Sequence, residues 1–294
     1  MARSHPPTLL KLAQRTLREE CALEPGERVL AAVSGGPDSM ALLDVLAKLS
    51  PKLAFEVVAH GVDHGLRPEA AGELELAAGH AHRLGVAFRV SRLELEPGGN
   101  LQARARTARY RALEEAAERE GARLIATAHH ADDRAETVLL RLLRGAGPRG
   151  LAVLPAREGN RIRPLLRARR ADVLLHLERH GVPFATDPSN KNRRFLRVRV
   201  REELLPLLVE LSPGIVEHLN ALADALGLER ARIAAGAFDQ PRLELGRAQR
   251  LALERAKKLG QRHAAVRLPG GWEARVDIST GAVRLELAGR STRR

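Results

Sequence analysis

Residues 28–39 constrain the fold of this chain more than any other stretch of its sequence. They read Arg-Val-Leu-Ala-Ala-Val-Ser-Gly-Gly-Pro-Asp-Ser. The apolar run 29–33 predicts a buried strand, and the leucine spacing after Ser39 predicts a helix. Two adjacent glycines allow a sharp turn whose backbone N–H groups are not covered by side chains. A strand, a glycine turn and a helix N-terminus together predict a phosphate site, although a plain strand-to-helix turn has the same local pattern.

The charge of the chain favours a polyanionic partner. The formal net charge is +13, and almost all of the 49 basic residues are arginine, which suits bidentate contact with phosphate. A solubility role or a high-GC genome would produce the same bias. The single cysteine, Cys21, excludes a disulfide framework and a cysteine-rich metal site. The sequence contains no recognisable signal peptide or long apolar run, so we expect a cytoplasmic protein that does not engage a membrane.

Alternating strand and helix patterns predict an α/β fold with a Rossmann-like parallel sheet. Strands are expected at 29–33, 56–62, 86–90 and 123–128, with helices at about 72–84 and 101–119 between them. Residues 151–204 then carry thirteen Lys or Arg against six acidic residues, which predicts an arginine-rich helical extension that binds phosphates.

A second pattern begins near residue 213. Helices are expected at about 215–234 and 247–259, followed by short strands near 264–268, 272–278 and 283–287. This pattern predicts a small α+β C-terminal domain. We therefore place the domain boundary between 212 and 213, with a large catalytic domain at 1–212 and an accessory domain at 213–294.

Polar residues follow two of the expected strands, at the edge of a parallel sheet where ligands bind. Asp63, His64 and Arg67 follow the second strand, and His129 to Thr137 follows the fourth. Asp132 and Glu136 lie one helical turn apart and could hold Mg²⁺ on ATP phosphates. The alternative is purely structural: Asp133 as a helix N-cap with Glu136 three residues later would form a capping box.

The helix expected at 101–119 carries two arginines that share one face. Arg106 and Arg109 are three residues apart, which places them on the same side of the helix. Surface arginines are most often only solvated, so this spacing alone does not establish a site.

The loop Ser-Gly-Gly-Pro-Asp-Ser resembles the Ser-Gly-Gly-x-Asp-Ser loop of the ATP pyrophosphatase (PP-loop) enzymes, and four further stretches resemble one family among them, the tRNA(Ile)-lysidine synthases. These are His-His-Ala-Asp-Asp-x-Ala-Glu-Thr with Leu-Leu-Arg-Leu-Leu-Arg-Gly at 129–145, Val-Asp-His-Gly-Leu-Arg at 62–67, Arg-Pro-Leu-Leu at 163–166 and the run from Asp-Pro-Ser-Asn to Leu-Leu-Pro at 187–206. The resemblance spans about residues 25–210.

The resemblance implies a PP-loop ATP pyrophosphatase domain that ligates free L-lysine to carbon 2 of the wobble cytidine in a CAU-anticodon isoleucine tRNA, through an adenylated tRNA intermediate. ATP and Mg²⁺ are the implied cofactors, and the accessory domain would assist tRNA binding. A homodimer is an open alternative for its assembly.

The resemblance also implies roles for individual residues. The ATP-binding residues would be Ser34, Gly35, Gly36, Pro37, Asp38, Ser39, Asp63, His64 and Arg67. The catalytic residues would be Asp38, Asp132, Asp133, Glu136 and Arg106, with Asp38 and Asp132 as Mg²⁺ ligands and the acids also as partners of the lysine amine. The tRNA contacts would be Arg109, Arg193, Arg194, Arg197, Arg199 and Arg201.

This sequence departs from the family pattern at two positions: Gln102 stands where glutamate is frequent, and Arg134 stands where glutamine is usual. Three rival functions remain. A cytidine thiolase-like PP-loop enzyme would need cysteines, and a small-molecule PP-loop ligase would not need the arginine-rich stretch. A non-enzymatic RNA-binding module would not need both Ser-Gly-Gly-Pro-Asp-Ser and Asp-Asp-x-x-Glu at two strand ends. Internal pairing of Arg197 and Arg201 with Asp187, Glu202 or Glu203 is the alternative to tRNA contact.

Overall fold

The chain forms two compact units, Met1–Ala234 and Ala235–Arg294, in the computed structural model. The structure describes residues 7–63, 65, 69–93, 101–186, 195–234, 254–255, 258–259, 263–268, 272–277 and 283–287. The strands of the first unit are β1 (Arg28–Ala32), β2 (Glu56–Asp63), β3 (Ala87–Arg92), β4 (Leu124–Ala126), β5 (Arg157–Glu158) and β6 (Arg161–Ile162). Its helices are α1 (Leu9–Glu19), α2 (Pro37–Leu53), α3 (Glu69–Arg83), α4 (Leu101–Arg119), α5 (Ala131–Leu143), α6 (Pro148–Leu151), α7 (Arg170–His180), α8 (Leu196–Arg199), the π-helical turn η2 (Val200–Leu204), α9 (Leu205–Leu211) and α10 (Ile215–Ala234).

The strands of the first unit form one mostly parallel sheet in the order β3-β2-β1-β4-β6-β5. The pairs β1–β2, β1–β4, β2–β3 and β4–β6 are parallel, and only β5 runs antiparallel, as a hairpin with β6. Val29, Leu30 and Ala31 of the central strand β1 are fully buried, as expected for a strand covered on both faces. The predicted Rossmann-like parallel sheet is thus confirmed.

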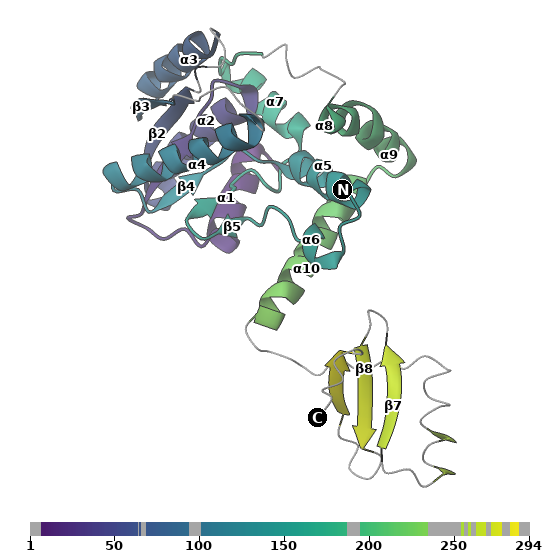
Figure 1. The fold of residues 1–294 in the computed structure, drawn as a ribbon. Coiled ribbons are helices and arrows are strands. Elements are labelled where there is room, and N and C mark those ends of the chain that lie inside the picture. The colour runs from purple at the N-terminus through teal and green to yellow at the C-terminus, as the bar shows by residue number, and fades with distance from the viewer. Residues whose placement is uncertain are drawn as a thin grey trace, which may run out of the picture. The chain divides into compact units, whose positions relative to one another are not determined.

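Helices cover the two faces of the sheet unequally (Figure 1). The α1, α2 and α7 helices share one apolar core with the sheet, built around residues such as Leu42, Leu46 and Leu177. On the opposite face, α4 packs Leu113 and its neighbours against Leu30 of β1 and Ile125 of β4. Because β1, β2 and β4 are parallel, the segments that follow them leave the sheet at one edge, as predicted.

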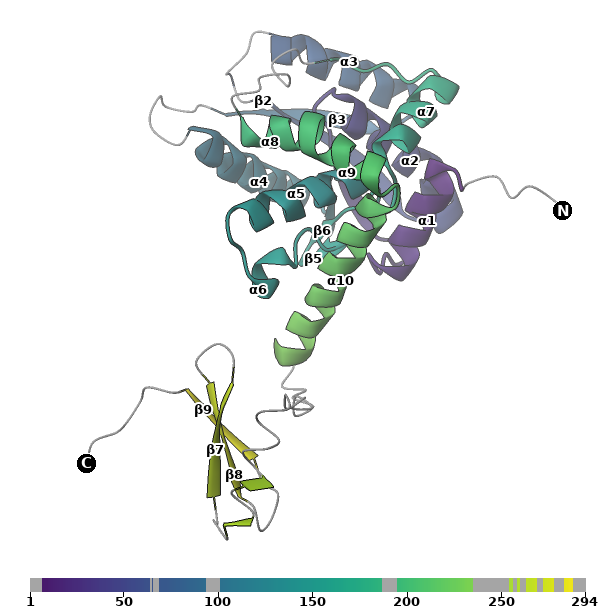
Figure 2. The same ribbon diagram turned by 90° about the vertical axis from the view of Figure 1, so that its right-hand side faces the viewer.

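A second apolar core joins α5, α6, α9 and α10 beside the sheet (Figure 2). Val216 and Ala223 of α10 are buried there against α5 residues such as Val138. This packing corrects the expected domain boundary: the first unit continues through α10 and ends at Ala234, rather than at residue 212. The α10 helix itself begins and ends where the sequence predicts.

The second unit contains an antiparallel three-stranded sheet in the order β7-β8-β9. Its strands are β7 (His263–Leu268), β8 (Trp272–Asp277) and β9 (Val283–Leu287), which confirms the three predicted strands. Most of the helix expected at 247–259 lies outside the described residues.

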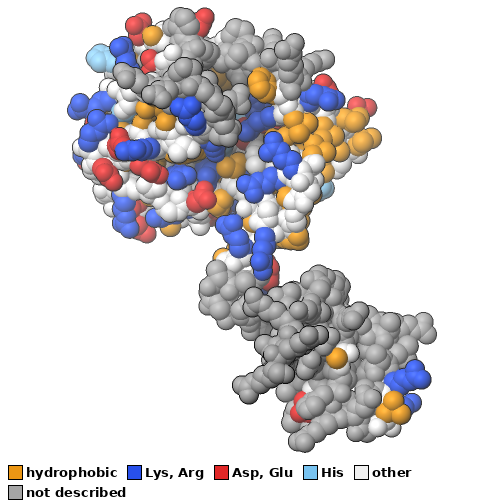
Figure 3. Space-filling model, viewed as in Figure 1, with side chains coloured by type: hydrophobic (Ala, Val, Ile, Leu, Met, Phe, Trp, Pro, Cys, Tyr) orange, Lys and Arg blue, Asp and Glu red, His pale blue; other side chains and the backbone are white. Residues whose placement is uncertain are grey.

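The surface of the first unit mixes both signs of charge, and hydrophobic side chains gather over α8 and α9 (Figure 3). Leu207 and Leu211 of α9 are among the exposed large hydrophobic residues. Within the described part of the chain, no helix has the length and apolar character needed to cross a membrane.

An ion pair of the buried Arg134 links α5 to α10. The Arg134 Nη1 atom lies 2.7 Å from Asp224 Oδ1 of α10, and its Nε donates to the Val153 carbonyl at 2.9 Å. The Arg134 side chain is only 2% exposed, whereas that of Asp224 is 33% exposed. A buried guanidinium that lost its carboxylate would remain desolvated and unpaired, which is costly.

We therefore predict that Asp224→Asn lowers the free energy of unfolding by about 2–3 kcal/mol, less than for a fully buried pair because Asp224 is partly solvated. Chemical denaturation measures this change. Asp224 also pairs with Arg167, which keeps its pair with Glu20 in this variant. The double variant Arg134→Gln/Asp224→Asn should therefore recover the part of the loss that comes from the unpaired Arg134. Arg15→Gln, which removes an exposed pair with Glu19, should cause no measurable change. A double variant as unstable as Asp224→Asn would contradict this account.

Candidate functional site

The glycine turn between β1 and α2 is the predicted phosphate site, and its backbone has the expected shape. Gly35 has φ +81°, and Gly36 is the N-cap of α2 with Pro37 at the first helical position. A Cβ atom at Gly35 would lie under 3.0 Å from the backbone of Glu73 in α3, so only glycine fits there. The first N–H groups of α2 have no carbonyl partner within the helix and face the sheet edge.

The Ser39 hydroxyl forms two hydrogen bonds with the backbone of the turn. Its Oγ accepts a hydrogen bond from the Ser34 N–H at 3.1 Å and donates to the Gly36 carbonyl at 2.9 Å. The Gly35 carbonyl accepts from the Ala185 N–H at 2.9 Å, so the segment after α7 also holds the turn. The turn is therefore fixed from both sides before any ligand arrives.

A buried carboxylate behind the turn links three helices. Asp44 of α2 accepts hydrogen bonds at 2.7 Å from His176 of α7 and from Lys48, and its other oxygen lies 3.5 Å from His80 of α3. Burial alone would raise the pKa of Asp44, but His176 and Lys48 hold it below its ordinary value. This cluster secures α3 and α7, the elements that contact Gly35, against α2.

Asp38, in the first turn of α2, faces His130 across the sheet edge. Asp38 Oδ1 lies 3.6 Å from His130 Nε2, and among the described residues neither buried atom has a hydrogen-bond partner. The Asp133 N–H donates to His130 Nδ1 at 3.3 Å, which leaves Nε2 as the ring atom that faces Asp38. Burial raises the pKa of Asp38, while His130 and Arg170 oppose that shift. The Asp38 side chain is 30% exposed.

The N-terminus of α5 differs from the predicted capping box. The N-cap is His130, and Asp133 is the third helical residue, whose carboxylate accepts from the His130 N–H at 3.1 Å. The box exists, but it is shifted so that Glu136 plays no part in it.

Asp132 is already engaged by two arginines that the sequence analysis did not select. Arg169 donates to both carboxylate oxygens of Asp132 at 3.1–3.2 Å, and the Arg170 N–H donates at 2.8 Å. Arg169 also reaches Glu217 of α10 at 3.0 Å. These bonds do not favour the predicted Mg²⁺ role of Asp132. The position of Arg169, after the strand β6 and just before α7, is the sequence signal that could have placed it at this sheet edge.

Asp133 and Glu136 form a cluster with Arg197 and Arg201. Arg201 Nε donates to Glu136 at 2.5 Å and its Nη2 to Asp133 at 3.2 Å, while Arg197 reaches the same two acids at 3.2 and 3.4 Å. The Glu136 and Asp133 side chains are only 2% and 12% exposed. Burial would raise the pKa of Asp133, but His130, His129 and Arg197 hold it below its ordinary value.

Arg197 and Arg201 do pair internally, with Asp133 and Glu136. The predicted internal partners were Asp187, Glu202 and Glu203, of which Asp187 lies outside the described residues. Contact of these two arginines with tRNA stays a prediction. Arg199 instead pairs with Glu203 at 3.1 Å on the exposed side of the helix. Arg193, Arg194, His64 and Arg67 lie outside the described residues.

The remaining predicted residues lie around the same edge. Asp63, the last residue of β2, accepts from the Gly65 N–H at 2.9 Å. Arg106 and Arg109 of α4 lie 5.1 and 5.5 Å from the centre of the Tyr110 ring. His129 lies between these groups: burial lowers its pKa to about 4, and the cations of Arg163, Arg106 and Arg197 add to this effect.

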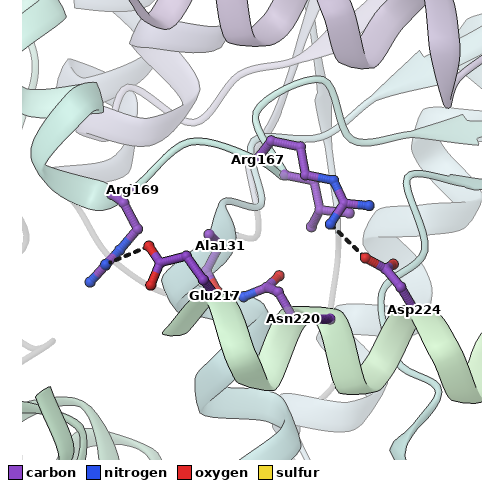
Figure 4. Close-up of a pocket in the computed structure, with 8 residues that line it drawn as sticks. Ala131, Arg167, Arg169, Glu217, Asn220 and Asp224 are labelled. Carbon is purple, nitrogen blue, oxygen red and sulfur yellow. Dashed lines mark hydrogen bonds and ion pairs between the residues drawn. The ribbon is translucent and has the colours of Figure 1, made fainter. Parts of the chain in front are cut away.

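A small cavity of about 180 Å³ lies behind Asp132, where α10 faces the segment before α7 (Figure 4). Asn220 projects into its floor and donates to the Ala131 carbonyl at 2.9 Å. Arg167 and Arg169, which line it, each form ion pairs with acids of α10, Asp224 and Glu217. The cavity walls are therefore charge-neutralised and anchor α10 to the site.

Comparisons with known proteins agree with this geometry. Residues 9–208 match the family described as the PP-loop domain. The tRNA(Ile)-lysidine synthase of Novosphingobium aromaticivorans is 43% identical over 211 residues, which cover 69% of this chain and 64% of that protein. The tRNA(Ile)-lysidine synthase of Salinispora arenicola is 40% identical over 236 residues, covering 77% and 70%.

The chain spans only part of some relatives. The tRNA(Ile)-lysidine synthase of Symbiobacterium thermophilum is 42% identical over 216 residues, but these cover 44% of its length. The match therefore spans less than two thirds of both the Novosphingobium and the Symbiobacterium proteins.

Among solved structures, a U34-tRNA thiolase from Methanococcus maripaludis superposes with a TM-score of 0.63 at 19% identity, covering 74% of this chain and 80% of the thiolase. At that identity the likeness establishes the fold alone. The PP-loop match over residues 9–208 and the Salinispora relative show the family: this chain belongs to the PP-loop family, among the tRNA(Ile)-lysidine synthases.

Proposed function

We propose that this protein ligates free L-lysine to C2 of the wobble cytidine in a CAU-anticodon isoleucine tRNA and consumes ATP to AMP and pyrophosphate. The observation that best supports this is the meeting, at one sheet edge, of a glycine turn lined with free N–H groups and a cluster of two acids with two arginines. The names of the relatives support the same reaction.

In the first step, the C2 oxygen of the cytidine attacks the α-phosphorus of ATP, the α–β phosphoanhydride bond breaks, and pyrophosphate leaves. The N–H groups of Gly35, Gly36 and the first turn of α2 would hold the phosphates and stabilise the charge that develops on them. No lysine of the Walker type follows the turn, which fits cleavage between the α and β phosphates rather than transfer of the γ-phosphate.

The residues of the edge fit a magnesium ion that is carried in with ATP. Asp38 offers a carboxylate with an unpartnered oxygen, and Mg²⁺ commonly uses one or two carboxylates together with substrate phosphates. Asp132 would not contribute, because both its oxygens accept hydrogen bonds from Arg169. When bound, the ion would supply charge neutralisation for the departing pyrophosphate.

In the second step, a lysine amine attacks C2, a C–N bond forms, and the C2–O bond to AMP breaks. The cluster of Asp133, Glu136, Arg197 and Arg201 has the charges needed to bind an amino acid, with carboxylates for an ammonium group and guanidinium groups for a carboxylate. We therefore move Arg197 and Arg201 from the tRNA surface to the lysine site. Arg109, Arg193, Arg194 and Arg199 remain as tRNA contacts in this proposal.

The rival thiolase reaction is not favoured by the one cysteine. Cys21 is fully buried, and burial raises the pKa of its thiol to about 11. A buried, protonated thiol is a poor nucleophile for sulfur transfer.

We predict that ATP is converted to AMP and pyrophosphate only when CAU-anticodon tRNA is present. Pyrophosphate release should be measured with and without tRNA and lysine. Asp38→Asn preserves the side-chain volume and should lower the rate by about 100-fold or more while the melting temperature changes little. Accumulation of ADP and orthophosphate instead would rule out the proposed reaction.

We predict that Glu136→Gln raises the KM for lysine at least about tenfold with little effect on the KM for ATP, because a buried carboxylate that pairs with an ammonium contributes more than about 1.4 kcal/mol. Glu203→Gln, which disturbs only the exposed pair with Arg199, is the matched control and should leave both constants unchanged. If folded Glu136→Gln keeps the parent KM for lysine, the lysine site lies elsewhere.

We predict that His129 makes the protein less stable as the pH falls. The folded pKa is about 4, below the ordinary value of 6.5, so the unfolded chain binds a proton that the native state does not. Stability is then lost as the pH falls from 6.5 towards 4, by up to ~1.4 kcal/mol per pH unit for one group.

Denaturation at pH 7.5, 6.5 and 5.5 tests this, with His129→Gln expected to flatten the decline. His82→Gln, a change at an exposed histidine of α3, serves as the control. An identical decline in parent and His129→Gln proteins would show that His129 does not cause it.

A further inference from the structure

Tyr110, the one tyrosine in the sequence, is surrounded by three arginines, two from α4 and one from β6. The guanidinium carbons of Arg161, Arg106 and Arg109 lie 4.6, 5.1 and 5.5 Å from the centre of its ring. Arg106 also donates to the Tyr110 hydroxyl at 3.3 Å. The ring is partly exposed, so these groups lie at the protein surface.

Among the described residues, acidic side chains balance only part of the positive charge of this cluster. Arg161 pairs with Glu114 at 3.2 Å, but within the described ranges no carboxylate lies within 4.0 Å of Arg106 or Arg109. By contrast, Arg169, Arg197 and Arg201 at the sheet edge are all paired with acids. Cation–π attraction to one ring offsets only part of the repulsion among three cations, so the cluster is suited to bind an external anion.

The shape of the cluster favours RNA over an isolated phosphate. Guanidinium planes and an aromatic ring present flat surfaces against which unpaired bases stack, and the same guanidinium groups bind phosphate. The cluster is also close to the site, because Arg161 of β6 lies in register with Ile125 of β4, the strand that leads into His129 and α5. RNA that delivers a nucleotide to this edge would pass over α4.

We propose that Tyr110, Arg106, Arg109 and Arg161 form a contact surface for single-stranded RNA next to the nucleotide that is modified. Tyr110 orders the guanidinium groups, and the arginines bind the phosphates and bases that flank the target. The inference rests on the proposed function and deepens it, because it assigns Tyr110 and Arg161 to the RNA substrate.

The competing explanation is structural. In that case the ring and the arginines only cover the sheet and stabilise α4, and their removal would lower the melting temperature without affecting RNA. ATP phosphates are the other anion that these arginines could meet, so ATP affinity must be measured beside RNA affinity.

The test compares Tyr110→Phe, which keeps the aromatic face, with Tyr110→Leu, which removes it. Binding of a CAU anticodon stem-loop RNA is measured by fluorescence anisotropy at several salt concentrations, together with ATP affinity and melting temperature. We expect Tyr110→Phe to stay within about twofold of the parent and Tyr110→Leu to bind RNA about tenfold more weakly, with ATP affinity unchanged. Arg106→Gln/Arg109→Gln should flatten the slope of log affinity against log salt by about 1.4.

Arg111→Gln is the matched control. Arg111 lies on the same helix, is 81% exposed and already pairs with Glu115, so its loss should leave RNA affinity unchanged. Three results would overturn the inference: parent-like RNA affinity in folded Tyr110→Leu, a lower melting temperature with unchanged RNA affinity, or a loss of ATP affinity instead. A parent protein that binds no RNA would contradict the proposed function itself, which separates the two failures.

Discussion

Two buried carboxylates at the start of α5 determine how the arginine-rich part of the chain packs. Asp133 and Glu136 cannot remain charged and buried without cations, because unpaired buried charge costs several kcal/mol. Arg197 and Arg201 supply these cations from a segment far along the sequence. The π-helical turn η2 begins between them, and such turns are frequent at functional sites. The pairs thereby bring α8 and η2 over the sheet edge and place cations and anions in one cluster.

The same principle joins α10 to the first unit. Arg134 contacts Asp224, Arg167 connects Asp224 to Glu20, and Arg169 links Asp132 to Glu217. Each of these three arginines lies at or near the sheet edge and pairs with an acidic residue of α10. The buried arginine at position 134 requires an anionic partner, and Asp224 of α10 provides it.

The elements that depend on local sequence pattern could be predicted from the sequence. The ion pairs between residues far apart in the chain could not. The apolar run of β1, the two glycines and the leucines of α2 predicted the strand, turn and helix, because backbone sterics and burial act locally. The parallel order also predicted that Asp38, Asp63 and Asp132 would share one edge. Periodicity could not reveal that His130 caps α5, that Arg169 donates hydrogen bonds to Asp132 or that α10 belongs to the first unit. The last two of these outcomes depend on three-dimensional pairing between residues that lie far apart in the sequence.

The arginines around the site fall into two groups with different physical behaviour. Arg169, Arg197 and Arg201 are partly buried and paired, so added salt screens them weakly, whereas Arg106 and Arg109 lack acidic partners among the described residues and are exposed to screening. A small zwitterion that replaces existing ion pairs exchanges one set of charges for another and releases few counterions. A polyanion that binds the unpaired group releases many. In the proposed reaction, one sheet edge would therefore recognise an amino acid and an RNA by separate electrostatic means, and ionic strength would affect the RNA step far more than the amino-acid step.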